Sequence, residues 1–132
     1  MREHCTFAGW LDSERLCELL ARVSALVIPS VWEEPLGLVA LEGALAHIPV
    51  VASRVGGIPE QLEEGKHALF FSPGDAQGCA KALISVLIRP AETDARVARA
   101  YAHALTRSPS AYGEQMADFV NEALEALRRD RG

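Results

Sequence analysis

Glu34 and Glu42 stand eight positions apart around the start of a predicted helix. Ionised carboxylates only accept hydrogen bonds, which suits them to the vicinal hydroxyls of a sugar. Gly37 lies between them and lets a ligand approach the backbone closely. The N–H groups of the first helical turn, around Leu36 to Val39, can donate to ligand oxygens. The alternative is that a glutamate before a helix only complements the helix dipole. Their spacing alone leaves both interpretations open.

A second glycine-rich turn, Gly56-Gly57, leads into another predicted helix with Pro59 near its first position. The N–H groups of such a turn can lie beside an anion or a phosphate. The alternative is a tight strand-to-helix turn with no ligand. The turn matches neither the dinucleotide-binding glycine pattern nor the P-loop.

Trp10 follows Gly9 and can stack on a base or a sugar, or pack as an ordinary aromatic. The histidines show no metal-ligand spacing, and we expect them to be surface or hydrogen-bonded groups: His4, His47, His67 and His103. No CxxC pair exists among the cysteines, which we expect to be free thiols in buried helices or strands: Cys5, Cys17 and Cys79. The histidines and cysteines thus show no metal-binding pattern, and free cysteines suit a reducing, cytoplasmic location.

The elements that would position these residues alternate short apolar runs with helical periodicities. This alternation predicts an α/β fold with a parallel sheet and helices on both of its faces. The predicted strands are residues 5–8, 25–28, 49–52 and 68–71, and the predicted helices begin at residue 12 or 13 and cover 37–47, 59–64, 75–88 and 91–105. Ligands of open α/β sheets bind beyond the carboxyl ends of the strands. The loops after the first three strands should therefore meet at one edge.

The composition sets limits on these predictions. The chain has 132 residues, enough for one domain, and is 49% hydrophobic with a formal net charge of −5. This balance gives no electrostatic footprint for nucleic acid. No secretory signal and no transmembrane segment is recognisable. Residues 108–132 carry a strong apolar stripe, which we interpret as a C-terminal helix that packs on a core or on a partner domain.

Several spaced motifs then occur in order over most of residues 5–90. They are Phe7-Ala8-Gly9, Ile28-Pro29-Ser30, Glu34-Pro35-Leu36-Gly37-Leu38-Val39, Leu41-Glu42, Ile48-Pro49-Val50-Val51-Ala52-Ser53, Gly56-Gly57-Ile58-Pro59-Glu60 and Pro73-Gly74-Asp75. Together they resemble the signature of family-4 retaining glycosyltransferases. The resemblance implies a GT-B enzyme with two Rossmann-like domains. Residues 1–107 would be the nucleotide-sugar-binding domain without its first βα units, and 108–132 the C-terminal helix.

The resemblance also implies roles for individual positions. Glu34 would be the catalytic acid beside the donor sugar, and Glu42 would accept from the ribose hydroxyls. The implied contacts of the donor are the backbone at Leu36, Gly37 and Leu38 for the sugar or diphosphate, Gly9 and Trp10 for the base, and Gly56 and Gly57 near the phosphate. The chain departs from the family pattern at Leu36, where Phe is usual, and at Ile48, where Gly is usual before the proline.

The resemblance implies that the protein transfers a sugar from a nucleotide-diphosphate sugar to an acceptor, with retention and without a metal or other cofactor. The cationic residues that hold the diphosphate and the N-terminal acceptor domain are absent from this sequence. We expect exposed apolar surface and self-association as a result, with any membrane contact made peripherally through the missing domain. Two alternatives stay open: a nucleotide-sugar-binding module without catalysis, and a structural α/β domain, which would leave the Glu34 and Glu42 spacing unexplained.

Overall fold

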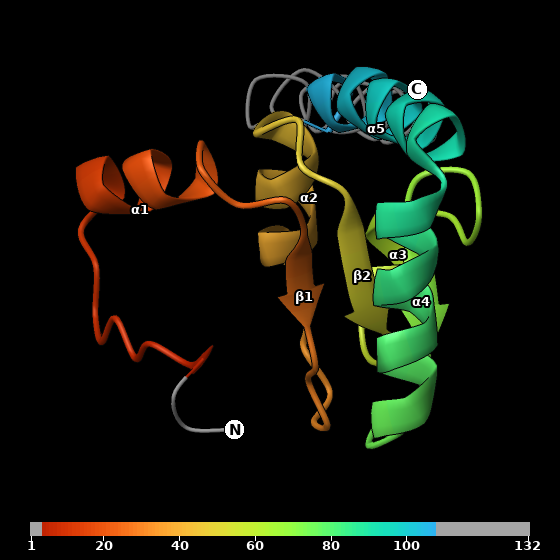
Figure 1. Cartoon of the computed structure of the whole chain (residues 1–132), viewed down its shortest axis with the longest axis horizontal. Helices are drawn as coiled ribbons and strands as arrows, with labels where there is room; N and C mark the ends of the chain where they lie inside the picture. The colour runs from red at the N-terminus through yellow and green to blue at the C-terminus, as the bar shows by residue number, and fades with distance from the viewer. Residues whose placement is uncertain (1–3, 108–132) are drawn as a thin grey trace, which may run out of the picture.

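The computed structural model describes residues 4–107, which form a three-stranded parallel sheet with helices around it (Figure 1). The elements in chain order are α1 (Ser13–Leu20), β1 (Leu26–Ile28), α2 (Leu38–Leu45), β2 (Val50–Ser53), α3 (Ile58–Gln61), β3 (Leu69–Phe71), α4 (Ala76–Ile88) and α5 (Pro90–Leu105). The strands lie in the order β1-β2-β3. The predictions of strands near residues 25–28, 49–52 and 68–71 are confirmed.

The central strand β2 separates two apolar clusters. Val50 and Ala52 face one cluster, to which α2 and α5 contribute. Val51 faces the other cluster, which contains Phe71 of β3 and Val86 of α4. Successive side chains of a strand point to opposite faces, so both faces of β2 are covered and all four of its residues are buried. The predicted α/β fold with helices on both faces of a Rossmann-like sheet is confirmed.

Short polar contacts set the helix starts that the sequence predicts. Asp12 caps α1 by accepting from the Arg15 N–H at 2.9 Å, and Asp75 caps α4 by accepting from the Gly78 N–H at 2.9 Å. The Thr93 hydroxyl of α5 donates to the Val86 carbonyl of α4 at 2.9 Å, which fixes the two helices to each other. Figure 1 shows α5 at the end of the sheet opposite to the arrowheads of the strands.

The predicted strand at residues 5–8 is wrong. Those residues have no regular structure, and Phe7 is 94% exposed. A strand exists only through hydrogen bonds to a neighbour, and among the described residues β1 pairs with β2 alone. The adjoining helix α1 buries none of its residues and stands to the side of the sheet (Figure 1). Cys5 and Cys17 are therefore exposed, against our expectation of burial, whereas Cys79 is half-buried in α4.

The C-terminal helix predicted for residues 108–132 lies outside the described residues. No helix within residues 4–107 is long and apolar enough to span a membrane.

The expectation that Ile48 stands at the glycine position of the turn between α2 and β2 is wrong. The residue with left-handed backbone there is His47, with φ at 57°, so the position that favours glycine is His47 and not Ile48. The His47 ring stacks on Tyr101 of α5, with ring centroids 3.8 Å apart. His47 thus combines a ring contact with a backbone conformation that L-residues rarely adopt.

We predict that His47→Gly is about 1 kcal/mol more stable than His47→Ala, because both remove the ring and only glycine relieves the left-handed strain. Urea unfolding measures the difference. Ala46→Gly is the control, because Ala46 has φ at −80° and should lose stability on becoming glycine. A His47→Ala variant as stable as His47→Gly would contradict the assignment of strain.

Candidate functional site

The loops after β1 and β2 meet backbone to backbone at the carboxyl edge of the sheet. The Gly57 N–H donates to the Glu34 carbonyl at 2.7 Å. Gly56 has φ at 55°, and a Cβ on it would overlap the Glu34 main chain. A Cβ on Gly57 would stand 2.5 Å from the Pro35 carbonyl oxygen. Of the three loops predicted to meet at this edge, those after β1 and β2 do so, and Gly56 and Gly57 allow their close approach.

The Glu34 carboxylate is held by a neighbouring serine. The Ser30 hydroxyl donates to Glu34 Oε1 at 2.8 Å. Ser53, at the end of β2 and fully buried, donates its hydroxyl to the Ser30 carbonyl at 2.5 Å, with the Ile28 carbonyl as a second acceptor at 3.3 Å. Sequence reasoning missed both roles. The available signal was a serine at or just after the carboxyl end of each of two neighbouring apolar strands.

The start of α2 lies beside this glutamate and has no side-chain cap. Its N-cap is Gly37, with φ at 62°, and a Cβ there would stand 2.8 Å from the Cα of Ile58. Among the described residues, the N–H groups of Leu38 and Val39 have no hydrogen-bond partner. Since the Glu34 carboxylate bonds to Ser30 and not to these amides, Glu34 does not cap the helix. The first turn thus presents open N–H donors, four and five residues after Glu34 in the chain.

Glu42 lies on the exposed side of α2 and faces a groove that Glu34 does not line. It lines a groove of about 390 Å³ between α2 and α1, together with Ser13, Leu16, Cys17, Leu20, Leu45 and Ala46. Leu36 and Leu38 are exposed beside the Glu34 loop. Nothing lies within 4 Å of a Cβ built on Gly9, and Trp10 is 88% exposed. The roles implied for Gly9 and Trp10 stay predictions.

Comparison with known proteins then identifies the family. A family model described as group 1 glycosyl transferases matches residues 1–103. The chain belongs to this family. It is 45% identical over 100 residues to a glycogen synthase of Mycobacterium tuberculosis, covering 76% of this chain and 24% of that protein. It is 33% identical over 119 residues to a D-inositol 3-phosphate glycosyltransferase of Streptomyces griseus, covering 90% and 25%.

Solved structures agree with the fold of this group 1 glycosyl transferase chain. Sucrose-phosphate synthase from Thermosynechococcus elongatus has a TM-score of 0.80 at 30% identity, covering 92% of this chain and 30% of that one. HepE from Anabaena, in complex with UDP-glucose, has a TM-score of 0.73 at 27% identity, covering 80% and 29%. The fold is thus Rossmann-like and of the GT-B type. The chain spans about a quarter of the length of the curated relatives named above.

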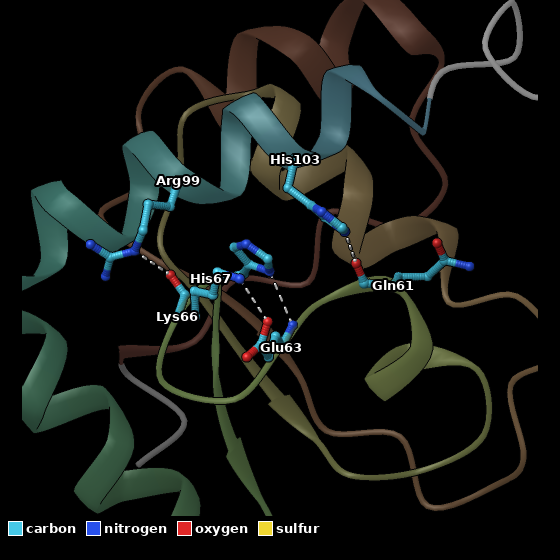
Figure 2. Close-up of polar contacts among 6 residues, drawn as sticks. All are labelled: Gln61, Glu63, Lys66, His67, Arg99 and His103. Atoms are coloured by element: carbon cyan, nitrogen blue, oxygen red, sulfur yellow. Dashed lines mark hydrogen bonds and ion pairs between the residues drawn. The ribbon is translucent and has the colours of Figure 1, made fainter.

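A second polar cluster in this glycosyl transferase chain joins α5 to the loop that precedes β3 (Figure 2). Arg96 Nε donates to the Gly65 carbonyl at 3.2 Å, and Arg99 Nε donates to the Lys66 carbonyl at 3.0 Å. His103 Nε2 lies 2.8 Å from the Gln61 carbonyl. These α5 side chains bind main-chain atoms at the end of α3 and in the loop that follows, so the cluster holds residues 61–66 in place. Within residues 4–107, no group of three His, Cys, Asp or Glu residues is arranged to hold a metal.

His67 is the buried histidine of this cluster, only 5% exposed. Its ring stacks on His103 with centroids 4.4 Å apart, and its Nδ1 accepts from the Glu63 N–H at 3.2 Å. The expectation of hydrogen-bonded histidines is confirmed for both. Burial lowers the pKa of His67, and the positive charges of His103, Lys66 and Arg99 lower it further, whereas Glu63 opposes the shift.

We predict that alanine at Gly56 destabilises the chain more than alanine at Gly74. Both glycines have positive φ, 55° and 78°, so both variants lose about 1 kcal/mol to backbone strain. Gly74 has nothing within 4 Å of an added Cβ, whereas Gly56→Ala also forces the Glu34 loop away, at roughly 1–3 kcal/mol more. Chemical unfolding gives the free energies, and amide resonances near Glu34 report the displacement. Equal losses in the two variants would contradict the close approach.

We predict that stability falls as the pH drops below the ordinary histidine pKa of about 6.5. Below that pH His67 binds a proton in the unfolded chain but stays neutral in the folded chain, because folding lowers its pKa. The unfolded state therefore binds more protons, and stability falls with pH until the pKa of the folded state is passed. His67→Asn, which keeps an acceptor near Nδ1, should flatten this dependence, and His4→Asn on the exposed N-terminal segment should not. Unfolding free energies between roughly pH 5 and 7.5 measure the slopes. Identical slopes in wild type and His67→Asn would refute the role of His67.

Proposed function

We propose that this chain is the donor-binding part of a family-4 retaining glycosyltransferase. The enzyme would transfer a sugar from a nucleotide-diphosphate sugar to an acceptor. The observation that carries the proposal is the Glu34 carboxylate, held by Ser30 in the loop that leads from the carboxyl end of β1 to the open first turn of α2. A carboxylate can accept from the hydroxyls of a sugar, and open N–H groups can donate to the oxygens of a diphosphate, so the two suit the two parts of a sugar diphosphate. The similarity to HepE, which was solved with UDP-glucose, supports it.

In this proposal Glu34 lies beside the sugar ring. As the bond to the diphosphate breaks, the anomeric carbon gains positive charge, and a carboxylate close to it is worth more in the transition state than before it. The backbone at Leu36, Gly37 and Leu38 contacts the sugar or the diphosphate. Gly56 and Gly57 close the phosphate side of the site, because they lie against the Glu34 loop.

Glu42 binds the ribose from the groove between α1 and α2. This separates the two acids by function, since Glu34 contacts the sugar and Glu42 contacts the nucleoside. Trp10 and Gly9 lie in the segment that precedes α1, so we assign the base to that side of the groove. We expect no metal ion, on the family resemblance alone.

The rest of the enzyme supplies the acceptor site and the cationic groups that stabilise the leaving diphosphate. We propose that it packs against the edge of β1 that is unpaired within residues 4–107. It would also cover apolar side chains of the loop that follows, Val31 and Trp32, which are 70% and 61% exposed. In isolation the same surfaces favour self-association of the chain. If no acceptor site exists elsewhere, the chain serves as a nucleotide-sugar-binding module, and its donor contacts are the same. The cytoplasmic location, with peripheral membrane contact through the missing domain, is part of this proposal.

We predict that the purified chain binds UDP-, GDP- or ADP-sugars weakly in an NMR titration, because the cationic groups for the diphosphate lie in the rest of the enzyme. The two acids should respond differently. Glu42→Gln should weaken binding of the nucleotide and of its sugar alike, because both contain the ribose. Glu34→Gln should weaken binding of the nucleotide sugar alone. Losing a hydrogen bond to a charged group costs roughly 1.5–3 kcal/mol, or about 10- to 150-fold in affinity.

Glu33→Gln is the matched control, because Glu33 is the exposed carboxylate adjacent to Glu34. It should change neither affinity. If no nucleotide sugar of the panel binds, the proposed function fails. If Glu33→Gln weakens binding as much as Glu34→Gln does, the effect is one of net charge and the assignment of Glu34 fails.

A further inference from the structure

The hydroxyl of Ser30 has an unusual acceptor for a serine in a turn. Serines in loops commonly bond to backbone groups close by in the chain and so stabilise the turn itself. Ser30 instead donates to a side chain, the Oε1 atom of Glu34, at 2.8 Å. The backbone of this loop is held by other groups, through the Gly57 N–H to the Glu34 carbonyl and the Ser53 hydroxyl to the Ser30 carbonyl. The Ser30 hydroxyl therefore acts on the direction of a carboxylate.

The anchor of this arrangement is buried. Ser53 is fully buried at the end of β2, and its hydroxyl reaches across to the chain leaving β1. Gly57, four residues later, bonds to the same loop at Glu34. The backbone at residue 30 and the backbone at residue 34 are thus both attached to β2 and its loop. The Ser30 hydroxyl therefore connects one attached residue, Ser30, to the carboxylate of the other attached residue, Glu34.

The two oxygens of Glu34 are consequently not equivalent. Oε1 accepts from Ser30, whereas Oε2 has no hydrogen-bond partner among the described residues. A carboxylate with one oxygen engaged presents the other in a defined direction, and a charge-assisted hydrogen bond depends on that direction. A carboxylate on three rotatable side-chain bonds would otherwise lose rotamer entropy on binding a ligand hydroxyl.

We propose that Ser30 is a positioning residue that orients Glu34 so that Oε2 accepts from a hydroxyl of the donor sugar, with Ser53 as its support. This inference rests on the proposed function for its ligand. It assigns to Ser30 the preference for a nucleotide sugar over the bare nucleotide, because only the sugar carries the hydroxyl that Oε2 meets. Ser30 touches neither the nucleotide nor the reacting bond.

The test compares Ser30→Ala with Ser30→Thr, which keeps the hydroxyl. Affinities for UDP-glucose and UDP are measured on the 132-residue chain by NMR titration. We expect Ser30→Ala to lower the affinity for UDP-glucose about tenfold, with UDP unchanged, and Ser30→Thr to restore it. Ser72→Ala is the matched control, because Ser72 follows β3 at the same edge and is exposed. An equal loss for UDP and UDP-glucose in Ser30→Ala, or no loss at all, would overturn the proposal.

A second measurement needs no ligand and separates this inference from the proposed function. The side-chain coupling constants of Glu34 report whether χ1 and χ2, which place its carboxylate, are fixed in one rotamer or averaged over several. We expect one rotamer in wild type and Ser30→Thr, and averaging in Ser30→Ala. If wild type binds no nucleotide sugar but this pattern appears, the proposed function fails and the positioning role of Ser30 stands. Unchanged couplings in Ser30→Ala would overturn the positioning role whatever the chain binds.

Discussion

The carboxyl edge of this sheet depends on the close approach of two backbones. Neighbouring strands lie about 4.8 Å apart, so the loops that leave β1 and β2 start close together and normally diverge to make room for side chains. Here they stay together, because Gly56 and Gly57 place only main-chain atoms against Glu34 and Pro35. The hydrogen bond from Gly57 to Glu34 then replaces the ladder bonds that end with the strands. Gly37 allows a similar close approach of two backbones where α2 begins against Ile58.

This close approach explains why a glutamate can be held at the edge of a small sheet. Glu34 is attached through its carbonyl to one loop and through its carboxylate to Ser30. The layers behind it supply the rigidity, since the fully buried strand β2 packs against helices on both faces. At the other end of the strands, α5 fixes the loop before β3. The sheet is thus held firmly at one end and presents donors and acceptors at the other.

Features that depend on neighbours along the chain could be predicted from the sequence. The three strands and the caps at Asp12 and Asp75 are examples, because short apolar runs and capping side chains act within a few residues. Residues 5–8 show the limit, because a strand requires a partner strand that an apolar run cannot reveal. The bond from Ser53 to Ser30 joins residues 23 positions apart and exists only because β1 and β2 are neighbours. The sequence could suggest Glu34 and Gly56 as site residues, but their contact follows from strand order.

The way in which α5 holds the loop before β3 has a consequence for divergence among related proteins. Arg96, Arg99 and His103 bind carbonyl oxygens, and every residue type offers the same carbonyl. The exposed side chain of Lys66 can therefore change over evolutionary time without loss of this attachment, whereas α5 must keep side chains that reach the carbonyls. Aligned homologues should accordingly vary at residue 66, whereas Gly65, with φ at 72°, is restricted by its backbone and one face of α5 by the donors that it must keep.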